Sequence, residues 1–393
     1  MISIGRLPIT AGSSMLAMTL IFPPHCSRVS ISIKDSCQLC HIKRKDLPLP
    51  EFNWAIIGPG GIANRFAEAA DSRIHAVYGR NQVNAQAFAD RHQRAGAPAI
   101  IVAPDVASML QDEAIDAVYI ATPHSSHAQA ARACLAAGKP VLCEKPLTPT
   151  LQASRELVAM ARQHNTFLME ALWSRFLPLY ASVGTWLAEG AIGTVHSIQS
   201  SFCFPAPCTP DTAWTRLYNP ALAGGALLDI GFYNVALSRW VLERALGACP
   251  APAAISAHGV LAPTGVDQSV HATLAFPGGQ VAQFACSFDA VSDNSLRILG
   301  SQGCIILPKD FWQATTATLQ RHGAEPEHIE RPFATNGFEY EIAEVMRCVR
   351  GGLMESPGMR HAETLAIAEC LEQLQHKVGA ARMPLNELLE DIA

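Results

Sequence analysis

The chain changes character at about residue 51, where short apolar runs begin to alternate with segments of helical periodicity. The apolar runs cover residues 53–57, 74–78, 115–121, 140–143 and 166–169. The helical segments start at residue 62 and also cover residues 84–91, 128–137 and 151–164. Apolar strands that alternate with helices are typical of a parallel, doubly wound sheet covered on both faces. We therefore expect an α/β domain over residues 51–170.

The pattern differs after residue 170. Strand-like segments cover residues 195–204, 253–261, 269–276, 281–288 and 296–299, and helices are expected over residues 225–242, 338–350 and 361–378. Pro277, Gly278 and Gly279 predict a hairpin turn between two of these strands. These segments indicate an α+β domain with a large, mainly antiparallel open sheet over residues 171–393.

Residues 1–50 show no sustained period of either kind. The apolar run over residues 15–22 is short and lacks a cleavage site of small residues. We interpret the segment as a disordered leader or an over-extended start of translation, with a targeting segment as the alternative. Cys37, Cys40 and His41 have the spacing of a c-type haem attachment site. We interpret that spacing as chance, with weak metal binding and haem attachment as the alternatives.

Composition narrows the class of protein. A chain of 393 residues is suited to two domains, and its 49% hydrophobic content excludes a disordered polyelectrolyte. Lys and Arg number 29 against 34 Asp and Glu, which argues against a nucleic-acid binder with a strongly basic surface. No uninterrupted apolar stretch approaches the roughly 20 residues that span a bilayer. Most of the 12 cysteines stand singly in apolar segments, as buried thiols do, so we expect a cytoplasmic protein.

Residues 58–63 carry the pattern G-x-G-x-x-G/A directly after a predicted strand and directly before a predicted helix. In this pattern the first glycine makes the tight turn, the second lets a pyrophosphate approach the backbone, and a small third residue permits close helix–sheet packing. The helix N-terminus then faces the phosphate charge. We predict a Rossmann-type dinucleotide site, to which the loop contributes Gly58, Gly60, Gly61, Ile62 and Ala63.

The end of the second predicted strand bears on which dinucleotide binds. NAD enzymes usually place Asp or Glu there, whereas residues 78–81 read Tyr-Gly-Arg-Asn and contain no carboxylate. The planar guanidinium of Arg80 can hold a 2′-phosphate and stack on adenine. We therefore predict a preference for NADP(H) over NAD, with an ordinary solvated arginine as the alternative.

A lysine lies just past the predicted strand at residues 140–143, at the edge where open α/β sheets bind ligands. Lys145 could donate a proton to a substrate hydroxyl, or accept one from it, during hydride transfer. Glu144 could orient it. If the segment Cys143-Glu144-Lys145-Pro146 is taken alone, the alternative is an ordinary surface lysine before a proline.

Four motifs occur together in the order and spacing of one family. They are Gly58-x-Gly60-x-x-Ala63, Ala121-Thr-Pro-His124 with His127, the segment 138–146 that ends in Glu144-Lys145-Pro146, and the segment 224–233. On these motifs the chain resembles the glucose–fructose oxidoreductase / inositol dehydrogenase (Gfo/Idh/MocA) family over roughly residues 52–380. Residues 170–178 and Tyr233 look most like the branch that contains dimeric dihydrodiol dehydrogenase and NADP-dependent D-xylose dehydrogenase.

The resemblance implies a catalytic set of Lys145, Asp229 and Tyr233. Many members carry Asp-x-x-x-His in the second domain, and here Tyr233 stands in the place of that histidine. A spacing of four puts Asp229 and Tyr233 on one helical face. Tyr233 would exchange the hydroxyl proton, Lys145 would lower the pKa of the phenol and hold the substrate oxygen, and Asp229 would orient the substrate or the lysine. A packed aromatic residue is the alternative for Tyr233.

Thr122, Pro123 and His124 follow the predicted strand at 115–121, so we expect their backbone to line the nicotinamide ribose pocket. His127 belongs to the same candidate cofactor site, and we expect it to cap or pack at the start of its helix.

Three residues are substrate-site candidates. Trp173 would form an apolar wall and Arg175 a clamp for a hydroxyl or carboxylate, with packing at the domain junction as the alternative for both. Trp214 lies, with Tyr218, in a loop that could close over the substrate. Outside residues 1–50, no His/Cys/Asp cluster has the spacing of a structural zinc site, so we predict no metal.

The expected function is NADP(H)-dependent hydride transfer to or from a secondary alcohol, diol or sugar carbon of a small-molecule substrate. The alternatives are an anhydro-sugar or inositol-type dehydrogenase, and a non-catalytic NADP(H)-sensing protein. From the resemblance we expect a homodimer or homotetramer that pairs through the second domain, with neither a nucleic acid nor a membrane as a partner.

Overall fold

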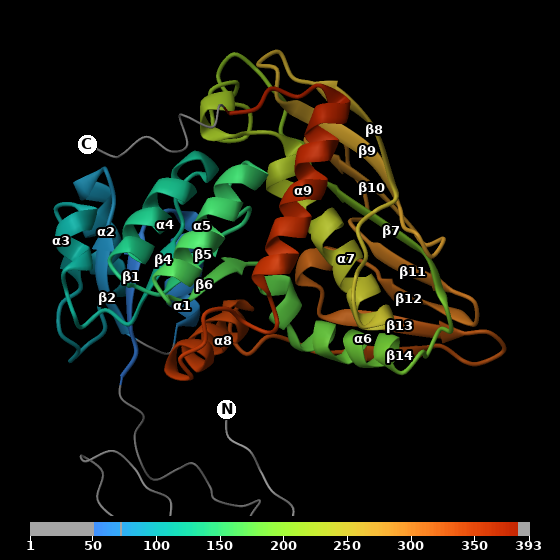
Figure 1. Ribbon diagram of the computed structural model, residues 1–393, viewed down its shortest axis with the longest axis horizontal. Helices are drawn as coiled ribbons and strands as arrows, with labels where there is room; N and C mark the ends of the chain where they lie inside the picture. The colour runs from blue at the N-terminus through green and yellow to red at the C-terminus, as the bar shows by residue number, and fades with distance from the viewer. Residues whose placement is uncertain (1–50, 71–72, 384–393) are drawn as a thin grey trace, which may run out of the picture. The chain divides into compact units, whose positions relative to one another are not determined.

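The computed structural model describes residues 51–70 and 73–383, so the leader expected over residues 1–50 lies outside the described residues (Figure 1). The first sheet is six-stranded and parallel, in the order β3-β2-β1-β4-β5-β6. Its strands are β1 (Asn53–Ile57), β2 (Arg73–Tyr78), β3 (Ile101–Val102), β4 (Ala117–Ile120), β5 (Val141–Glu144) and β6 (Leu168–Ala171). Its helices are α1 (Gly61–Ala69), α2 (Gln82–His92), α3 (Val106–Leu110), α4 (His127–Ala136) and α5 (Leu151–Gln163). The predicted doubly wound sheet is confirmed.

The strand order of this sheet reverses between β1 and β4. Ile57 pairs with Ile120 in parallel register, so both strands end at the same edge. Chain leaving β1 crosses to β2 on one side, and chain leaving β4 crosses to β5 on the other. Such a switch point opens a crevice at the carboxyl ends of the strands.

The second sheet has eight strands, in the order β14-β13-β12-β11-β7-β10-β9-β8. They are β7 (Val195–Cys203), β8 (Ala254–Leu261), β9 (Asp267–Ala275), β10 (Val281–Ser287), β11 (Leu296–Gly300), β12 (Gly303–Leu307), β13 (Thr316–Arg321) and β14 (Glu327–Glu330). Only the β7–β10 pair is parallel, so the predicted, mainly antiparallel sheet is confirmed. The predicted turn joins β9 to β10, where the Phe276 N–H donates to Gln280 O at 2.9 Å.

Most elements lie close to their predicted positions, and six were not predicted. Helices α8 (Phe338–Arg350) and α9 (His361–Val378) have the predicted bounds. The two-residue strand β3 and helices α3 and α6 (Pro178–Ala188) were not predicted, nor were strands β12 to β14. Strand β14 has no buried position, which leaves no apolar alternation to detect.

Helix α7 (Phe232–Leu246) lies in the apolar core of the second domain. The segment Pro220–Leu246 is long and apolar enough to cross a membrane by length and composition, yet 89% of its most apolar window is buried inside the fold. Helix α7 packs against β7 and β10 of the large sheet. It is therefore buried as a core helix among the described residues.

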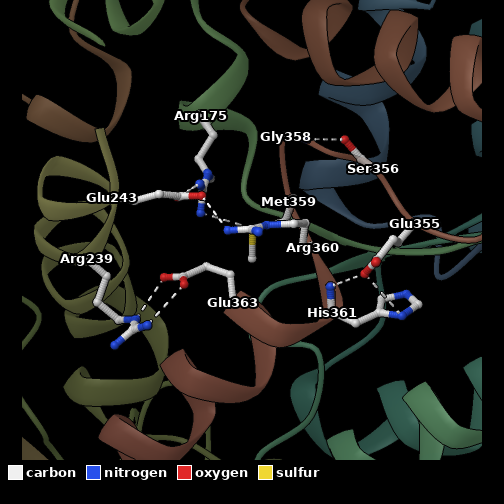
Figure 2. A network of polar contacts seen from close by, with 10 residues as sticks. All are labelled: Arg175, Arg239, Glu243, Glu355, Ser356, Gly358, Met359, Arg360, His361 and Glu363. Atoms are coloured by element: carbon white, nitrogen blue, oxygen red, sulfur yellow. Dashed lines mark hydrogen bonds and ion pairs between the residues drawn. The ribbon is translucent and has the colours of Figure 1, made fainter. Parts of the chain in front are cut away.

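Helix α9 ties the two sheets together. It packs against α5 of the first domain and against α7 and β8 of the second (Figure 1). His361, its first residue, lies with Nε2 at 2.9 Å from the Leu168 carbonyl oxygen in β6. Glu363 accepts two hydrogen bonds from the buried Arg239 of α7, at 2.8 and 3.0 Å (Figure 2). Removing one partner of such a buried pair typically costs about 3–5 kcal/mol.

Candidate functional site

The glycine loop after β1 has the geometry of a phosphate-binding turn. Gly58 has φ +92°, and a Cβ there would lie 2.8 Å from the Thr122 backbone nitrogen, so β4 leaves room only for glycine. A Cβ on Gly60 or Gly61 would meet no protein atom within 4 Å. Ala63 is fully buried against the sheet. The backbone at Gly60 and Gly61 is therefore open to a ligand.

Helix α1 begins in this loop with no side chain capping its first turn. Gly60 is the N-cap residue and brings no side-chain oxygen to the free N–H groups. Uncapped N–H groups at a helix start carry a partial positive charge and suit an anion such as a pyrophosphate. This arrangement fits a dinucleotide.

Two cavities extend from the loop and share Gly60, Ala121, Thr122 and Pro123 in their linings. One, of about 390 Å³, runs toward the end of β2. The other, of about 480 Å³, is the cleft toward the second domain. Arg80 lines the first cavity, and Ile62, His124, His127, Glu144, Lys145, Asp229 and Tyr233 line the second. A dinucleotide laid over the loop would have one cavity for each nucleoside.

Lys145 meets Asp229 and Tyr233 across the two domains. Its ammonium donates to the main-chain oxygen of Asp229 and lies 3.7 Å from the carboxylate oxygen Oδ1 of the same residue. Nζ is 4.8 Å from the centroid of the Tyr233 ring. The structure thus brings the amine after β5 and the phenol of α7 to one point in the cleft.

The Tyr233 hydroxyl is held by Trp173, whose indole N–H donates to it at 3.1 Å. Burial raises the pKa of Tyr233 well above its usual value, and the charges of Glu144 and Asp229 raise this pKa further. The expectation that Lys145 lowers the pKa of this phenol is therefore wrong. The ammonium lies over the face of the ring, and the surrounding carboxylates outweigh it. The phenol keeps its proton at neutral pH.

Asp229 stays ionised although it is buried. Burial acts to raise its pKa, but Lys145 and Arg216 more than offset that effect and hold the pKa below its usual range. The Arg216 guanidinium donates to Oδ1 at 2.9 Å. Arg216 was not predicted, because it lies in the loop between Trp214 and Tyr218, where no motif distinguishes it from an ordinary surface arginine.

Glu144 accepts hydrogen bonds from groups other than the Lys145 amine. Its Oε1 accepts from the Tyr119 hydroxyl at 2.5 Å, and its Oε2 accepts from the backbone N–H of Lys145 at 3.2 Å. Burial raises the pKa of Glu144. The interpretation that Glu144 orients the Lys145 amine is not what the structure shows, since Asp229 contacts that amine.

Asp229 lies in a π-helical turn, Leu227–Gly231, that leads into α7. The turn is anchored by Asp267, whose Oδ2 accepts the Leu227 N–H at 2.5 Å. Gly225, with φ +122°, is required here, because a Cβ would lie 2.5 Å from Asp267 Oδ1. The sequence predicted one continuous helix over 225–242, and the π turn is a local departure of a kind often found at functional sites.

The two histidines after β4 brace the loops around the cleft. His127 is fully buried, with its ring nitrogens 2.8 Å from Pro146 O and 2.9 Å from Thr122 O. His124 Nδ1 lies 3.1 Å from the Ala223 carbonyl oxygen. Burial lowers the pKa of His127, and burial together with His127 lowers the pKa of His124 to about 3. Both rings are neutral at physiological pH.

Aromatic side chains wall the half of the cleft that faces the second domain. They are Trp173, Phe202, Phe204, Tyr233, Trp312 and Phe338. Phe202 and Trp312 stack with ring centroids 3.5 Å apart. Trp173 is thus placed on the cleft as predicted. Apart from Tyr233 of α7, the other aromatics of this wall come from β7 and the chain just after it, from the loop after β12 and from α8, and no motif joins them.

Two substrate-site candidates lie elsewhere. Arg175 does not line the cleft, because its guanidinium forms an ion pair with Glu243 of α7 and lies beside the sulfur of Met359 (Figure 2). The contacts of Arg175 with Glu243 and Met359 therefore lie within the second domain and leave its guanidinium away from the cleft. Trp214 is 69% exposed and does not line the cleft. Among the described residues no group of three or more His, Cys, Asp or Glu could hold a metal ion.

Comparison with known proteins agrees with this geometry. Residues 52–172 match a family model described as "Oxidoreductase family, NAD-binding Rossmann fold", and residues 180–306 match the Gfo/Idh/MocA C-terminal domain. The chain is 33% identical over 340 residues to a trans-1,2-dihydrobenzene-1,2-diol dehydrogenase of Xenopus laevis, covering 83% of this chain and 98% of that protein. It is 35% identical over 338 residues to the enzyme of the same name from Mus musculus, covering 83% and 96%.

Solved structures share the fold. A 3-ketoreductase from Actinomadura kijaniata in complex with NADP and TDP-benzene has a TM-score of 0.71 at 24% identity, over 85% of this chain and all of that one. An aldose–aldose oxidoreductase from Caulobacter crescentus has a TM-score of 0.71 at 23% identity, over 83% and 97%. The chain is an NAD(P)-dependent oxidoreductase, and it belongs to the Gfo/Idh/MocA family.

Proposed function

We propose that this chain is an NADP(H)-dependent dehydrogenase that interconverts a secondary alcohol and a carbonyl on a cyclic diol or sugar. The observation that carries the proposal is the meeting of Lys145 Nζ with the ring of Tyr233, 4.8 Å apart, at the end of the cleft that starts from the glycine loop. When bound there, the nicotinamide would supply the hydride in reduction and take it back in oxidation. The protein must then move one proton to or from the substrate oxygen.

Lys145 and Tyr233 divide that task. In reduction, the substrate carbon gains the hydride and its oxygen gains a proton from the Lys145 ammonium, which gives the alcohol. The Tyr233 phenol donates a hydrogen bond to the same oxygen and keeps its own proton, since its pKa is raised. Asp229 is a positioning residue, because its main-chain oxygen and carboxylate both hold the ammonium.

The preference for NADP(H) is assigned to Arg80. It lies at the exposed rim of the cavity that runs toward β2, and the lining of that cavity contains no carboxylate. Asn81 accepts hydrogen bonds from the N–H groups of Val83 and Asn84 and so caps α2. A 2′-phosphate at this rim would meet a guanidinium and no opposing charge.

The aromatic wall supports a ring-shaped substrate. The relatives are named for a trans-dihydrodiol of benzene, a ring with two hydroxyls. Flat aromatic side chains offer an apolar surface to a ring face, and the polar pair at the cleft end receives a hydroxyl. We assign trans-dihydrodiols and aldoses such as D-xylose as the substrate class, with Trp214 on a loop that closes over the substrate.

Residues 51–170 would act as the cofactor domain and residues 171–393 as the substrate domain. Pairing of two or four copies is assigned to the outer face of the eight-stranded sheet. The polar side chains on that face surround a shallow hollow of about 720 Å³. The cysteines of the described residues are free thiols, which are typical of a reducing compartment. This supports a cytoplasmic enzyme.

The test is turnover of trans-dihydrodiols, D-xylose and inositol with NADP⁺ and NAD⁺, by the wild type and by Lys145→Met. The wild type should oxidise a diol or an aldose with NADP⁺, and the variant should lose about 10³-fold or more in kcat while its Kd for NADPH changes little. Turnover by Lys145→Met near the wild-type rate would refute the mechanism. Absence of turnover with every substrate and both cofactors would refute the function.

A further inference from the structure

Arg65 lines the cleft and has no part in the function proposed above. It lies on α1 four residues after Gly61, on the helix face that meets the cleft. The guanidinium carbon is 5.4 Å from the Trp173 ring and 5.2 Å from the Phe338 ring, and these two rings stack with centroids 4.9 Å apart. Asn336 donates to the Arg65 backbone oxygen at 2.8 Å. The half-buried side chain is therefore held against the aromatic wall.

Three permanent cations line the cleft, and Arg65 is the one without an ion pair among the described residues. Lys145 and Arg216 both pair with Asp229, with their nitrogens 3.7 and 2.9 Å from Oδ1. The remaining cleft carboxylate, Glu144, has both oxygens engaged by other donors. Arg65 acts on the Glu144 carboxylate through its charge, which helps to lower the pKa of Glu144, but it forms no ion pair with it.

The position of Arg65 points to the substrate rather than to the cofactor phosphates. The guanidinium lies on the rings of Trp173 and Phe338, and Trp173 also donates to the Tyr233 hydroxyl at 3.1 Å. An anion bound by Arg65 would thus lie next to the pair that handles the substrate oxygen. The planar guanidinium fork suits a carboxylate, which it can bind with two parallel hydrogen bonds.

We propose that Arg65 recognises a carboxylate on the substrate, so that the preferred substrates are ring or chain alcohols bearing an acid group, of the sugar-acid type. The inference rests on the proposed function and narrows its substrate class. It predicts that an acid is a better substrate than the neutral alcohol of the same skeleton.

The test compares kcat/KM for two matched pairs, D-glucuronate with D-glucose and D-xylonate with D-xylose, using NADP⁺. The wild type should favour the acid in at least one pair. Arg65→Gln should lower the acid-to-neutral ratio at least tenfold, and Arg65→Lys, which keeps the charge but loses the fork, should fall between. Arg155→Gln removes an exposed arginine on α5 that does not line the cleft and should leave the ratio within twofold.

Binding measurements separate the remaining outcomes. Calorimetry of D-glucuronate and D-xylonate with the NADP⁺-loaded enzyme tests the inference even where turnover is absent, so failure of the proposed function remains distinguishable. An unchanged ratio in Arg65→Gln with a tenfold weaker Kd for NADPH would show that the anion is a cofactor phosphate, and the proposal would be wrong. The proposal would also be wrong if neither the acid-to-neutral ratio nor the Kd for NADPH changed, because Arg65 would then serve only in packing.

Discussion

The phosphate-binding part of the cofactor half is built from the backbone of one loop, Gly58–Ala63, whereas the substrate half is built from side chains scattered between Arg65 and Phe338. In the first half, Gly58 permits a tight turn and Gly60 leaves the backbone open to a ligand, because neither residue has a side chain. In the second, Trp173 and Tyr233 act through a hydrogen bond between elements 60 residues apart. Backbone recognition needs local spacing, while side-chain recognition needs the tertiary fold. The two halves should accordingly fail in different ways when they are altered.

After the loss of kcat expected for Lys145→Met, the largest effect that separates the halves should come from Tyr233→Phe. Loss of the phenolic hydrogen bond to the substrate oxygen should lower kcat about 100-fold. NADPH affinity, measured by fluorescence titration, should stay within about threefold, because the cofactor half is untouched. Trp173→Phe removes the donor to the phenol and keeps the phenol itself, so it should cost less. A loss in Tyr233→Phe equal to that in Lys145→Met would mean that the phenol itself exchanges the proton.

Arg80→Asp should act on the other half alone. Replacing the cation by a carboxylate should reduce the preference for NADP⁺ over NAD⁺ about 30-fold, since a charge-assisted hydrogen bond contributes about 2 kcal/mol. Equilibrium dissociation constants for both cofactors provide the measurement. Arg91→Asp makes the same charge change elsewhere on the same domain and should leave the ratio as it was. An unaltered ratio in Arg80→Asp would contradict the assignment of NADP(H) to this residue.

A pair of glycine substitutions sharpens the comparison within the loop. Gly60→Ala adds a Cβ that meets no protein atom, so the melting temperature should hold while NADPH binds about tenfold more weakly. Gly58→Ala forces a Cβ against Thr122 at a positive φ and should lower the free energy of unfolding by about 1–2 kcal/mol or more. Thermal melts with and without NADPH distinguish the two. Equal destabilisation by both substitutions would show that Gly60 is structural.

The smallest expected effect is the pH dependence of stability that arises from His124 and His127. The pKa of His124 is lowered to about 3, from an unfolded value of 6.5, and burial also lowers the pKa of His127. Below pH 6.5 the unfolded chain therefore binds protons that the folded chain does not, and stability falls as the pH falls. Between pH 6.5 and 5.5 the free energy of unfolding should drop by about 1 kcal/mol through His124, and His127 should add to the drop in the same direction. Urea titrations at the two pH values check this, and His124→Asn should flatten the dependence. A rise in stability on acidification would contradict it.

The part of the molecule that could be predicted from sequence is the part encoded locally. The glycine loop and strand β1 follow from adjacent residues, and the wider family pattern connected Lys145 with Asp229 and Tyr233. The π turn at Leu227–Gly231 could not be predicted, because it depends on Asp267, 40 residues further on.

The same reason explains the errors in the substrate half. Arg175 has the chemistry of a substrate clamp, but its partner is Glu243 on a distant helix. Arg65 and Arg216 reach the cleft through the packing of α1 and of a long loop, which periodicity does not report. The pKa of Tyr233 depends on its burial and on the carboxylates around it, and both are properties of the assembled site.

Helix α9 reaches back from near the end of the chain to α5 and β6, and Met354, just before it, accepts the Leu168 N–H at 3.0 Å. A ribosome releases the nucleotide-binding sheet long before it makes the residues that cover its outermost strand. During synthesis the edge of that strand stays uncovered until about 190 further residues have emerged. The domain that is translated first is therefore completed last. A stop codon before residue 361 would leave the edge of its sheet uncovered.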